Sequence, residues 1–274
     1  MRKRTSIPLM LFATFWALFF LLPVLYVVFS AFKPRSELFK HIPTFFPETW
    51  TLDNFVRLIE NPFFMTYQWI WNSFVVAVAS TILAVVINTM SGYALAKFKF
   101  RGATVILIII LSTIMLPLEV IMVPISRIIR MFGLYNTLWA LIIPPAATPA
   151  GIFLMRQFLL TIPDDLIESA RIDGASEWRI FTSIIVPNAK PAIATIAIFS
   201  FMWRWNDYVW PLIAIRSPNR YTLQLGISTL SGEYTTDWSA LLAISTISMI
   251  PMLIVFLIFQ RQFVQSAAET GMKG

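Results

Sequence analysis

The chain has 274 residues, of which 58% are hydrophobic and only 13% are charged, and its mean hydropathy is +0.74. A soluble domain carries about 25% charged residues, so this chain has too little polar surface to cover a water-soluble globule. The composition excludes a soluble enzyme, a disordered protein and a free nucleic-acid binder. The net charge of +7 is spread in short clusters between apolar runs, which is typical of orientation signals in a membrane protein.

Metal and redox chemistry are not expected. The sequence contains no cysteine and a single histidine, so it cannot form a disulfide, a cysteine metal site or a histidine cluster. We therefore predict no metal site and no cofactor bound by this chain.

Six stretches can cross a membrane, since each can supply the roughly 20 apolar residues that a bilayer core requires. Four lie in gaps free of charge: between Arg4 and Lys33, Glu60 and Lys97, Arg130 and Arg156, and Asp237 and Arg261. A fifth is predicted over 102–124, interrupted only by Glu119, and a sixth over 191–214, whose second half contains Arg204 and Asp207. The sequence thus predicts an all-α integral membrane protein with about six transmembrane helices in a single domain, 1–274.

The first span is interpreted as a retained helix. Its apolar stretch from Ile7 to Phe32 is much longer than the roughly 7–15 residues of a signal-peptide core. The basic start Arg2-Lys3-Arg4 places the N-terminus in the cytoplasm by the positive-inside rule, and an even number of spans places the C-terminus there too.

The segment 161–187 is too long, charged and patterned for a simple connector. Pro163, Asp164 and Asp165 suit the first turn of a helix, where proline fits and acids favour the positive end of the dipole. Leu166, Ala170 and Ile172 are expected to form the apolar face of that helix.

A second short helix is expected to follow a break at Asp173-Gly174, because glycine can take positive φ. Ser176 can cap this helix, and Pro187 is expected to end it. Its apolar residues are Trp178, Ile180, Phe181, Ile184 and Ile185. Two short amphipathic helices at an angle make a compact feature that suits a groove on another protein.

The same loop carries a family pattern. Glu168-Ser169-Ala170 is followed by Asp173-Gly174-Ala175, and then by Ile184 and Pro187. This run resembles the EAA loop of bacterial ABC importer permeases, with Ser169 in place of an alanine and Val186 in place of a leucine. Other segments look like carbohydrate permeases of the MalG type: Asn72-Ser73, 91–102, 151–158, 205–212 and 271–274.

The resemblance implies a type I ABC importer permease fold in the cytoplasmic (inner) membrane of a bacterium or archaeon. It also implies a second homologous permease, two ATPase subunits that bind ATP-Mg, and an extracytoplasmic solute-binding protein as partners. The sequence contains no G-x-x-x-x-G-K-[ST] run, so the chain lacks the P-loop that cradles ATP phosphates. ATPase coupling is expected at Glu168, Ser169, Ala170, Asp173, Gly174, Ala175, Ile184 and Pro187.

The tail, residues 260–274, is expected to leave the last helix on the cytoplasmic side. By the same resemblance, Gly271, Met272, Lys273 and Gly274 would contact the ATPase subunits. The alternative is a frayed terminus.

Candidate residues for a solute pathway are Glu119, Trp205, Asn206 and Asp207. Ionisable groups inside membranes usually face a cavity or a partner, although Glu119 could equally be an acid near the external end of its helix. The aromatic, amide and carboxylate groups of 205–210 could bind a sugar, but an interfacial aromatic belt is the favoured interpretation.

A self-contained ion-coupled carrier is the alternative function. Such a carrier requires a coupling-ion site within the membrane, for which Glu119 and the pair Arg204 and Asp207 are the candidates. It would have no need for the patterned loop.

Overall fold

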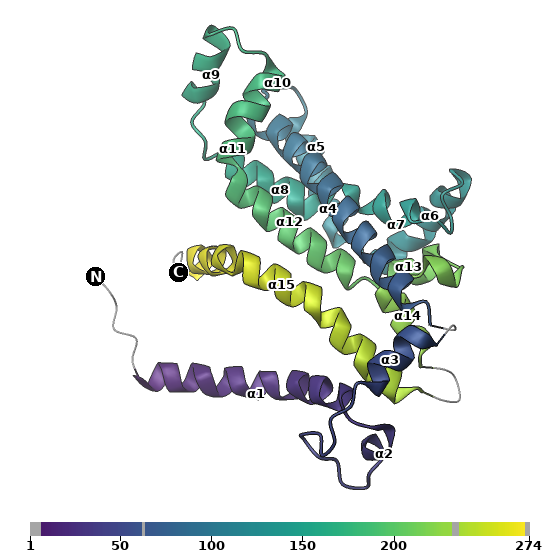
Figure 1. Ribbon diagram of the computed structural model, residues 1–274. Helices are drawn as coiled ribbons and strands as arrows, with labels where there is room; N and C mark the ends of the chain where they lie inside the picture. The colour runs from purple at the N-terminus through teal and green to yellow at the C-terminus, as the bar shows by residue number, and fades with distance from the viewer. Residues whose placement is uncertain (1–6, 62–63, 232–235, 272–274) are drawn as a thin grey trace. The chain divides into compact units, whose positions relative to one another are not determined.

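The computed structural model describes residues 7–61, 64–231 and 236–271, with side chains described up to residue 260. Within these residues the secondary structure is helical apart from one isolated bridge between Ser231 and Thr236. Figure 1 shows this all-helical chain. The predicted all-α fold class is confirmed.

In the described part of the chain, three helices are long and apolar enough to cross a membrane unbroken: α1 (Ile7–Ala31), α4 (Thr66–Lys97) and the part Trp238–Gln260 of α15 (Trp238–Gly271). Three further spans are bent pairs. In the first, α5 (Ala103–Ser112) and η1 (Thr113–Met115) meet α6 (Leu118–Met131) at 108°. In the second, α7 (Trp139–Ile142) and η2 (Pro144–Ala146) meet α8 (Pro149–Leu159) at 43°. In the third, α10 (Glu177–Ile180), η3 (Phe181–Ile185) and α11 (Val186–Asn188) meet α12 (Lys190–Trp205) at 77°. Counting each bent pair as one span confirms the expected six.

Prolines explain two of the breaks. Leu116 and Thr148 both have extended backbone, because the residue before a proline is disfavoured in the helical region. The span predicted over 102–124 is therefore two helices that meet at a bend rather than one straight helix. The break before Pro117 leaves Glu119 in the first turn of α6 rather than inside a straight helix.

The span expected over 191–214 is also shorter than predicted. Helix α12 ends at Trp205, and a separate short helix, α13 (Val209–Ala214), follows. The backbone N–H groups of Asn206 and Asp207 bond back to the carbonyls of Met202 and Arg204, which closes the last turn of α12. Arg204 and Asp207, the two charged residues of this span, therefore lie where the chain passes from α12 to α13.

The chain forms two compact units. The smaller comprises residues 1–67 and 226–252 and includes α1, α2 (Arg35–Leu38) and α3 (Asp53–Glu60). Its loop folds around Glu37, whose buried carboxylate accepts bonds from the Thr44 hydroxyl at 2.8 Å and the Glu48 N–H at 3.1 Å. Arg57 pairs with Asp237 at 3.1 Å, which joins α3 to the residue before α15.

The larger unit comprises Gln68–Leu225 and the end of α15 from Leu253. One apolar core joins α4, α6, α7 and α13, and a second joins α4, α8, the 161–187 segment and α12. Asn72 of α4 donates to the carbonyls of Asn219 and Tyr221, both at 3.0 Å; these residues flank the end of η4 (Pro218–Arg220), which precedes α14 (Leu223–Thr229). The second apolar core, which includes residues of α4, α8 and α12, positions the 161–187 segment, which is the candidate site.

The last helix is longer than expected. Helix α15 continues past Gln260 to Gly271, since Ala267, Ala268 and Glu269 are good helix formers and no proline interrupts them. The predicted contact residues Met272, Lys273 and Gly274 lie outside the described residues.

Candidate functional site

The first half of the 161–187 loop is helix α9 (Asp165–Ile172), which ends in a Schellman turn. The Ala175 N–H donates to the Ala170 carbonyl at 2.9 Å, and the Gly174 N–H donates to the Arg171 carbonyl at 3.0 Å. Gly174 has φ +79°, the left-handed conformation that glycine adopts at low cost at this position. The predicted break at Asp173-Gly174 is thereby confirmed as a defined turn.

The second half begins where it was predicted to begin. Ser176 has extended backbone, and its hydroxyl accepts from the Arg179 N–H at 3.3 Å, which caps α10. The helical path then widens into a π-turn at η3 and runs on to Asn188. The expectation that Pro187 ends this helix is wrong, since Pro187 lies inside α11. The wide turn immediately before it accommodates the residue that has no N–H to donate.

The buried face of α9 is not the predicted one. Ile167 is buried and Ala170 packs beside it, whereas Leu166 is exposed and Ile172 is 86% exposed. Leu166, Ala170 and Ile172 therefore do not share one buried face. The short helix turns its Ile167 side towards the second core because Ile180 and Ile185 of the second half also enter that core.

The residues of the family pattern divide into two groups. Ala170, Ala175 and Ile184 pack against the second core, while Glu168, Ser169, Asp173, Gly174 and Pro187 are exposed. Trp178 is 64% exposed and lies against Phe181, with ring centroids 5.6 Å apart. The loop therefore has a packed inner face and an outer face that carries charged, apolar and glycine positions.

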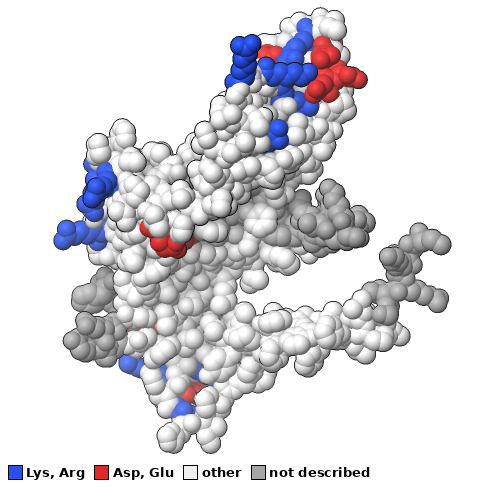
Figure 2. Space-filling view, turned by 180° about the vertical axis from the view of Figure 1, so that it is seen from behind, with Lys and Arg blue, Asp and Glu red and all other residues white. Residues whose placement is uncertain are grey.

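Charged groups gather at this end of the larger unit, where Figure 2 shows Lys and Arg next to Asp and Glu. A small polar pocket of about 210 Å³ is lined by Lys97, Phe98, Lys99, Asp164, Ile167, Glu168 and Arg171. The Lys97 ammonium donates to Asp164 Oδ1 at 2.6 Å. This hydrogen bond, together with the charge of Lys97, holds the pKa of the Asp164 carboxyl below its usual range.

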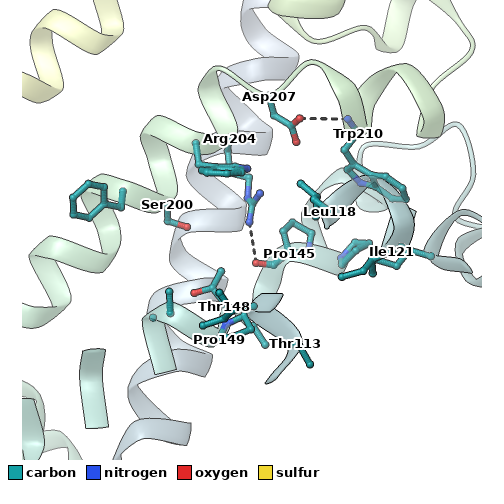
Figure 3. Close-up of a pocket in the computed structure, with 18 of the residues that line it drawn as sticks. Thr113, Leu118, Ile121, Pro145, Thr148, Pro149, Ser200, Arg204, Asp207 and Trp210 are labelled. Atoms are coloured by element: carbon teal, nitrogen blue, oxygen red, sulfur yellow. Dashed lines mark hydrogen bonds between the residues drawn. The ribbon is translucent and has the colours of Figure 1, made fainter. Parts of the chain in front are cut away.

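A larger cavity of about 690 Å³ lies within the same unit, between η1, the start of α6, η2, α8, α12 and the residues that follow α12. Its walls are mostly apolar, and a few polar groups reach it: Thr113, Thr148, Ser200, Arg204 and Asp207. In Figure 3, Arg204 points towards Pro145, whose carbonyl accepts from its Nη2 at 3.2 Å, and Asp207 Oδ1 accepts from the Trp210 N–H at 3.3 Å.

Two polar atoms of this cavity have no partner among the described residues. They are the Ser200 hydroxyl, on a residue only 8% exposed, and Nε of Arg204. Both atoms are shielded from solvent in this structure, and an unpaired buried polar group costs about 1–3 kcal/mol. An apolar cavity with a few convergent polar groups is a typical small-molecule site.

The predicted solute residues meet this cavity only in part. Asp207 lines it, whereas Glu119 and Asn206 are exposed outside its lining and Trp205 is 1% exposed inside the packed structure. Sequence reasoning missed Ser200, Thr148 and the role of Arg204 in the wall. The spacing of Ser200 and Arg204, four residues apart on one helix face, was the available signal.

The broken apolar helices and the half-open cavity are typical of a multi-pass helical membrane protein of the permease class. The chain belongs to the family described as "Binding-protein-dependent transport system inner membrane component", whose profile matches residues 88–268.

Two relatives are similar over nearly the whole chain. The arabinooligosaccharides transport system permease protein AraQ of Halalkalibacterium halodurans is 34% identical over 265 residues, which is 96% of this chain and 94% of the relative. The sn-glycerol-3-phosphate transport system permease protein UgpE of Escherichia coli O1:K1 is 32% identical over 256 residues, which is 90% of each chain. The resemblance to MalG-type permeases is confirmed, and these relatives are transport permeases rather than enzymes.

Solved structures show the same fold. A chain of a bacterial ABC transporter involved in the import of the acidic polysaccharide alginate matches with a TM-score of 0.82 at 24% identity, covering 92% of this chain and 93% of that chain. A bacterial alginate ABC transporter in complex with an alginate pentasaccharide-bound periplasmic protein matches with a TM-score of 0.65 at 15% identity, covering 92% and 91%.

Proposed function

We propose that this chain is one of two homologous permease subunits of an ATP-driven importer for a carbohydrate or a related solute. The 161–187 loop carries this proposal, because its Schellman turn and its share of the second core make it a rigid body rather than a connector. The relatives named for arabinooligosaccharides and for sn-glycerol-3-phosphate support the solute class. The subunit would lie in the cytoplasmic membrane with both termini and the loop in the cytoplasm.

The outer face of the loop suits a groove on an ATPase subunit. Leu166, Ile172 and Trp178 offer exposed apolar contacts, and Glu168 offers a carboxylate to a basic residue. Two ATPase subunits would bind ATP-Mg, and their closure would move the docked loop and tilt the helices packed against it, switching the pathway between its two sides. The end of the tail at Gly271–Gly274 is a second proposed contact with these subunits.

An extracytoplasmic solute-binding protein would deliver the solute. The family description refers to binding-protein-dependent transport, and the alginate transporter that shares this fold was solved with a periplasmic protein bound. Within this subunit, the cavity around Arg204 and Asp207 is the proposed part of the pathway. Its aromatic wall residues Trp203 and Trp210 suit the apolar faces of a sugar, and its polar groups suit the hydroxyls.

Gly174→Pro tests the proposal, with Gly133→Pro as the matched control. Both glycines have positive φ, +79° and +69°, and both donate a backbone hydrogen bond in a surface turn. Proline fixes φ near −65° and removes the donor, so each substitution disrupts one turn. In a reconstituted complex, we expect Gly174→Pro to abolish ATP-dependent uptake and Gly133→Pro to leave most of it.

Purification separates this function from the alternative. Co-elution of the chain with an ATPase and a second permease is expected. Uptake by the chain alone, without ATP and driven by an ion gradient, would instead establish the self-contained carrier. Equal uptake by the Gly174→Pro and unmodified complexes would overturn the role of the loop.

A further inference from the structure

Two buried side chains at the end of α4 bind opposite halves of the 161–187 loop. Tyr93 and Lys97 are four residues apart and therefore lie on one face of α4. The Lys97 side chain is only 4% exposed, and its ammonium donates to the Ile162 carbonyl and to Asp164 Oδ1, both at 2.6 Å. The first half of the loop is thus held at the point where α9 begins.

The second half is held one turn earlier on α4. The buried Tyr93 hydroxyl donates to Glu177 Oε2 at 3.1 Å, and Arg171 Nε donates to Glu177 Oε1 at 2.7 Å. Glu177 is the first residue of α10, and Arg171 lies in the last turn of α9. One carboxylate therefore joins both loop helices to α4.

Apolar contacts surround these polar bonds. The Tyr93 ring lies 5.3 Å from Phe98 and 5.6 Å from Phe181, measured between ring centroids. Gly92, the residue before Tyr93, lies so close to α8 that an added Cβ would be 2.6 Å from Met155 Cγ. The end of α4 is therefore packed on α8 as well as bound to the loop.

We propose that Tyr93 and Lys97, through Glu177 and Asp164, form a clamp that makes the end of α4 move as one body with the loop. This inference rests on the proposed function, because it concerns how motion received from an ATPase reaches the pathway. The loop is continuous with α12 through the chain, and the clamp adds a second, non-covalent route into α4. All four are positioning residues in this proposal, since they act through the contacts that they make between α4 and the loop.

The clamp is tested in the full complex, with permeases, ATPase and binding protein in proteoliposomes. Tyr93→Phe removes only the hydroxyl, and Lys97→Met removes the ammonium but keeps most of the stem. The controls are Tyr67→Phe and Lys40→Met, which make the same changes at two exposed positions, the second of them also an ion-paired lysine. We expect the double variant Tyr93→Phe/Lys97→Met to retain the ATPase on purification and to keep ATP hydrolysis, while solute imported per ATP hydrolysed falls about 3–10-fold.

Charge exchange supplies a readout that lost stability alone would not give. Lys97→Asp alone should lower the import-to-hydrolysis ratio, and the exchange Lys97→Asp/Asp164→Lys should recover part of it. An unchanged ratio in the double variant Tyr93→Phe/Lys97→Met, or no recovery on exchange, would overturn the clamp while leaving the proposed function intact. Failure of the unmodified chain to co-elute with any ATPase would instead overturn the proposed function.

Discussion

Asn88 and Thr148 hold each other by two hydrogen bonds: Asn88 Nδ2 donates to Thr148 Oγ1 at 2.9 Å, and the Thr148 N–H donates to Asn88 Oδ1 at 3.0 Å. Asn88 is fully buried in α4, and Thr148 is the residue that precedes α8. The pair therefore fixes the start of α8, which borders the cavity, against the middle of α4.

Asn88→Leu is expected to destabilise the protein by about 1–3 kcal/mol, because it leaves the Thr148 N–H without its acceptor. Asn188→Leu is the control: Asn188 is exposed and donates only within its own helical segment, to the Ile184 carbonyl at 2.7 Å. That change should stay within about 0.5 kcal/mol. Thermal unfolding of the detergent-purified protein measures both, and equal shifts in Tm would contradict the role of the pair.

Gly92→Ala is expected to destabilise the protein, although glycine to alanine within a helix normally stabilises by about 1 kcal/mol. The added Cβ would lie 2.7 Å from Met155 Cβ and 3.0 Å from the Arg156 backbone nitrogen, so the two helix backbones must separate. Overpacking of this kind costs about 1–3 kcal/mol. Measuring the unfolding free energy of Gly92→Ala and the unmodified protein tests this prediction. A gain in stability would show that α4 and α8 are not in such close contact.

Gly174→Ala is expected to cost about 1–2 kcal/mol through the left-handed conformation alone, because an added Cβ at this position has no heavy atom within 4 Å. Gly174→Asn should recover much of the loss, since asparagine tolerates this conformation. Chemical unfolding of the three proteins gives the comparison. If Asn is as damaging as Ala, the left-handed turn is not the cause.

Asp164→Asn is expected to make stability less dependent on pH in the acid range. The Lys97 hydrogen bond and charge, with smaller contributions from Lys99 and Arg171, lower the pKa of Asp164 in the folded state. A lowered pKa stabilises the folded state at pH values above the unfolded value of about 3.9, and this contribution is lost as the pH falls through the folded pKa. Tm measured against pH should therefore differ between the two proteins near neutrality and converge in acid; a constant difference would contradict this.

Ser200→Ala separates a solute contact from a structural one. Because the Ser200 hydroxyl has no partner among the described residues, its removal should leave the Tm unchanged or raise it. If the hydroxyl bonds the solute, a lost hydrogen bond of about 0.5–1.5 kcal/mol should lower uptake by about 2–10-fold. Ser126→Ala, at a half-buried position whose hydroxyl bonds to the Val123 carbonyl in its own helix, should change neither. Unchanged uptake by Ser200→Ala would remove Ser200 from the pathway.

The features that were predicted correctly depend on residues that are neighbours in the sequence. The six spans follow from the length of the apolar runs, and the turn at Gly174 and the cap at Ser176 follow from local backbone chemistry. The cavity wall could not be predicted in the same way, because Arg204, Pro145 and Thr148 meet only after two spans break. A proline at position 117 is typical of a helix end or kink, but the size of the bend there, 108°, cannot be predicted from the apolar run that continues through it.

The buried face of α9 was missed for a related reason. An eight-residue helix offers Leu166, Ile167, Ala170 and Ile172 as apolar candidates, and its own periodicity is too short to select among them. The selection is made by Ile180 and Ile185, which lie beyond the turn and share the core with Ile167.

The π-turn at Phe181–Ile185 contains one residue more than a regular α-helical turn. Deleting a single residue there would regularise the helix and rotate everything on its N-terminal side by about 100° about the axis. Glu177 would then turn away from Tyr93, although no atom of either side chain had changed. One extra residue therefore sets how far the loop is rotated about the axis of the helix that follows it.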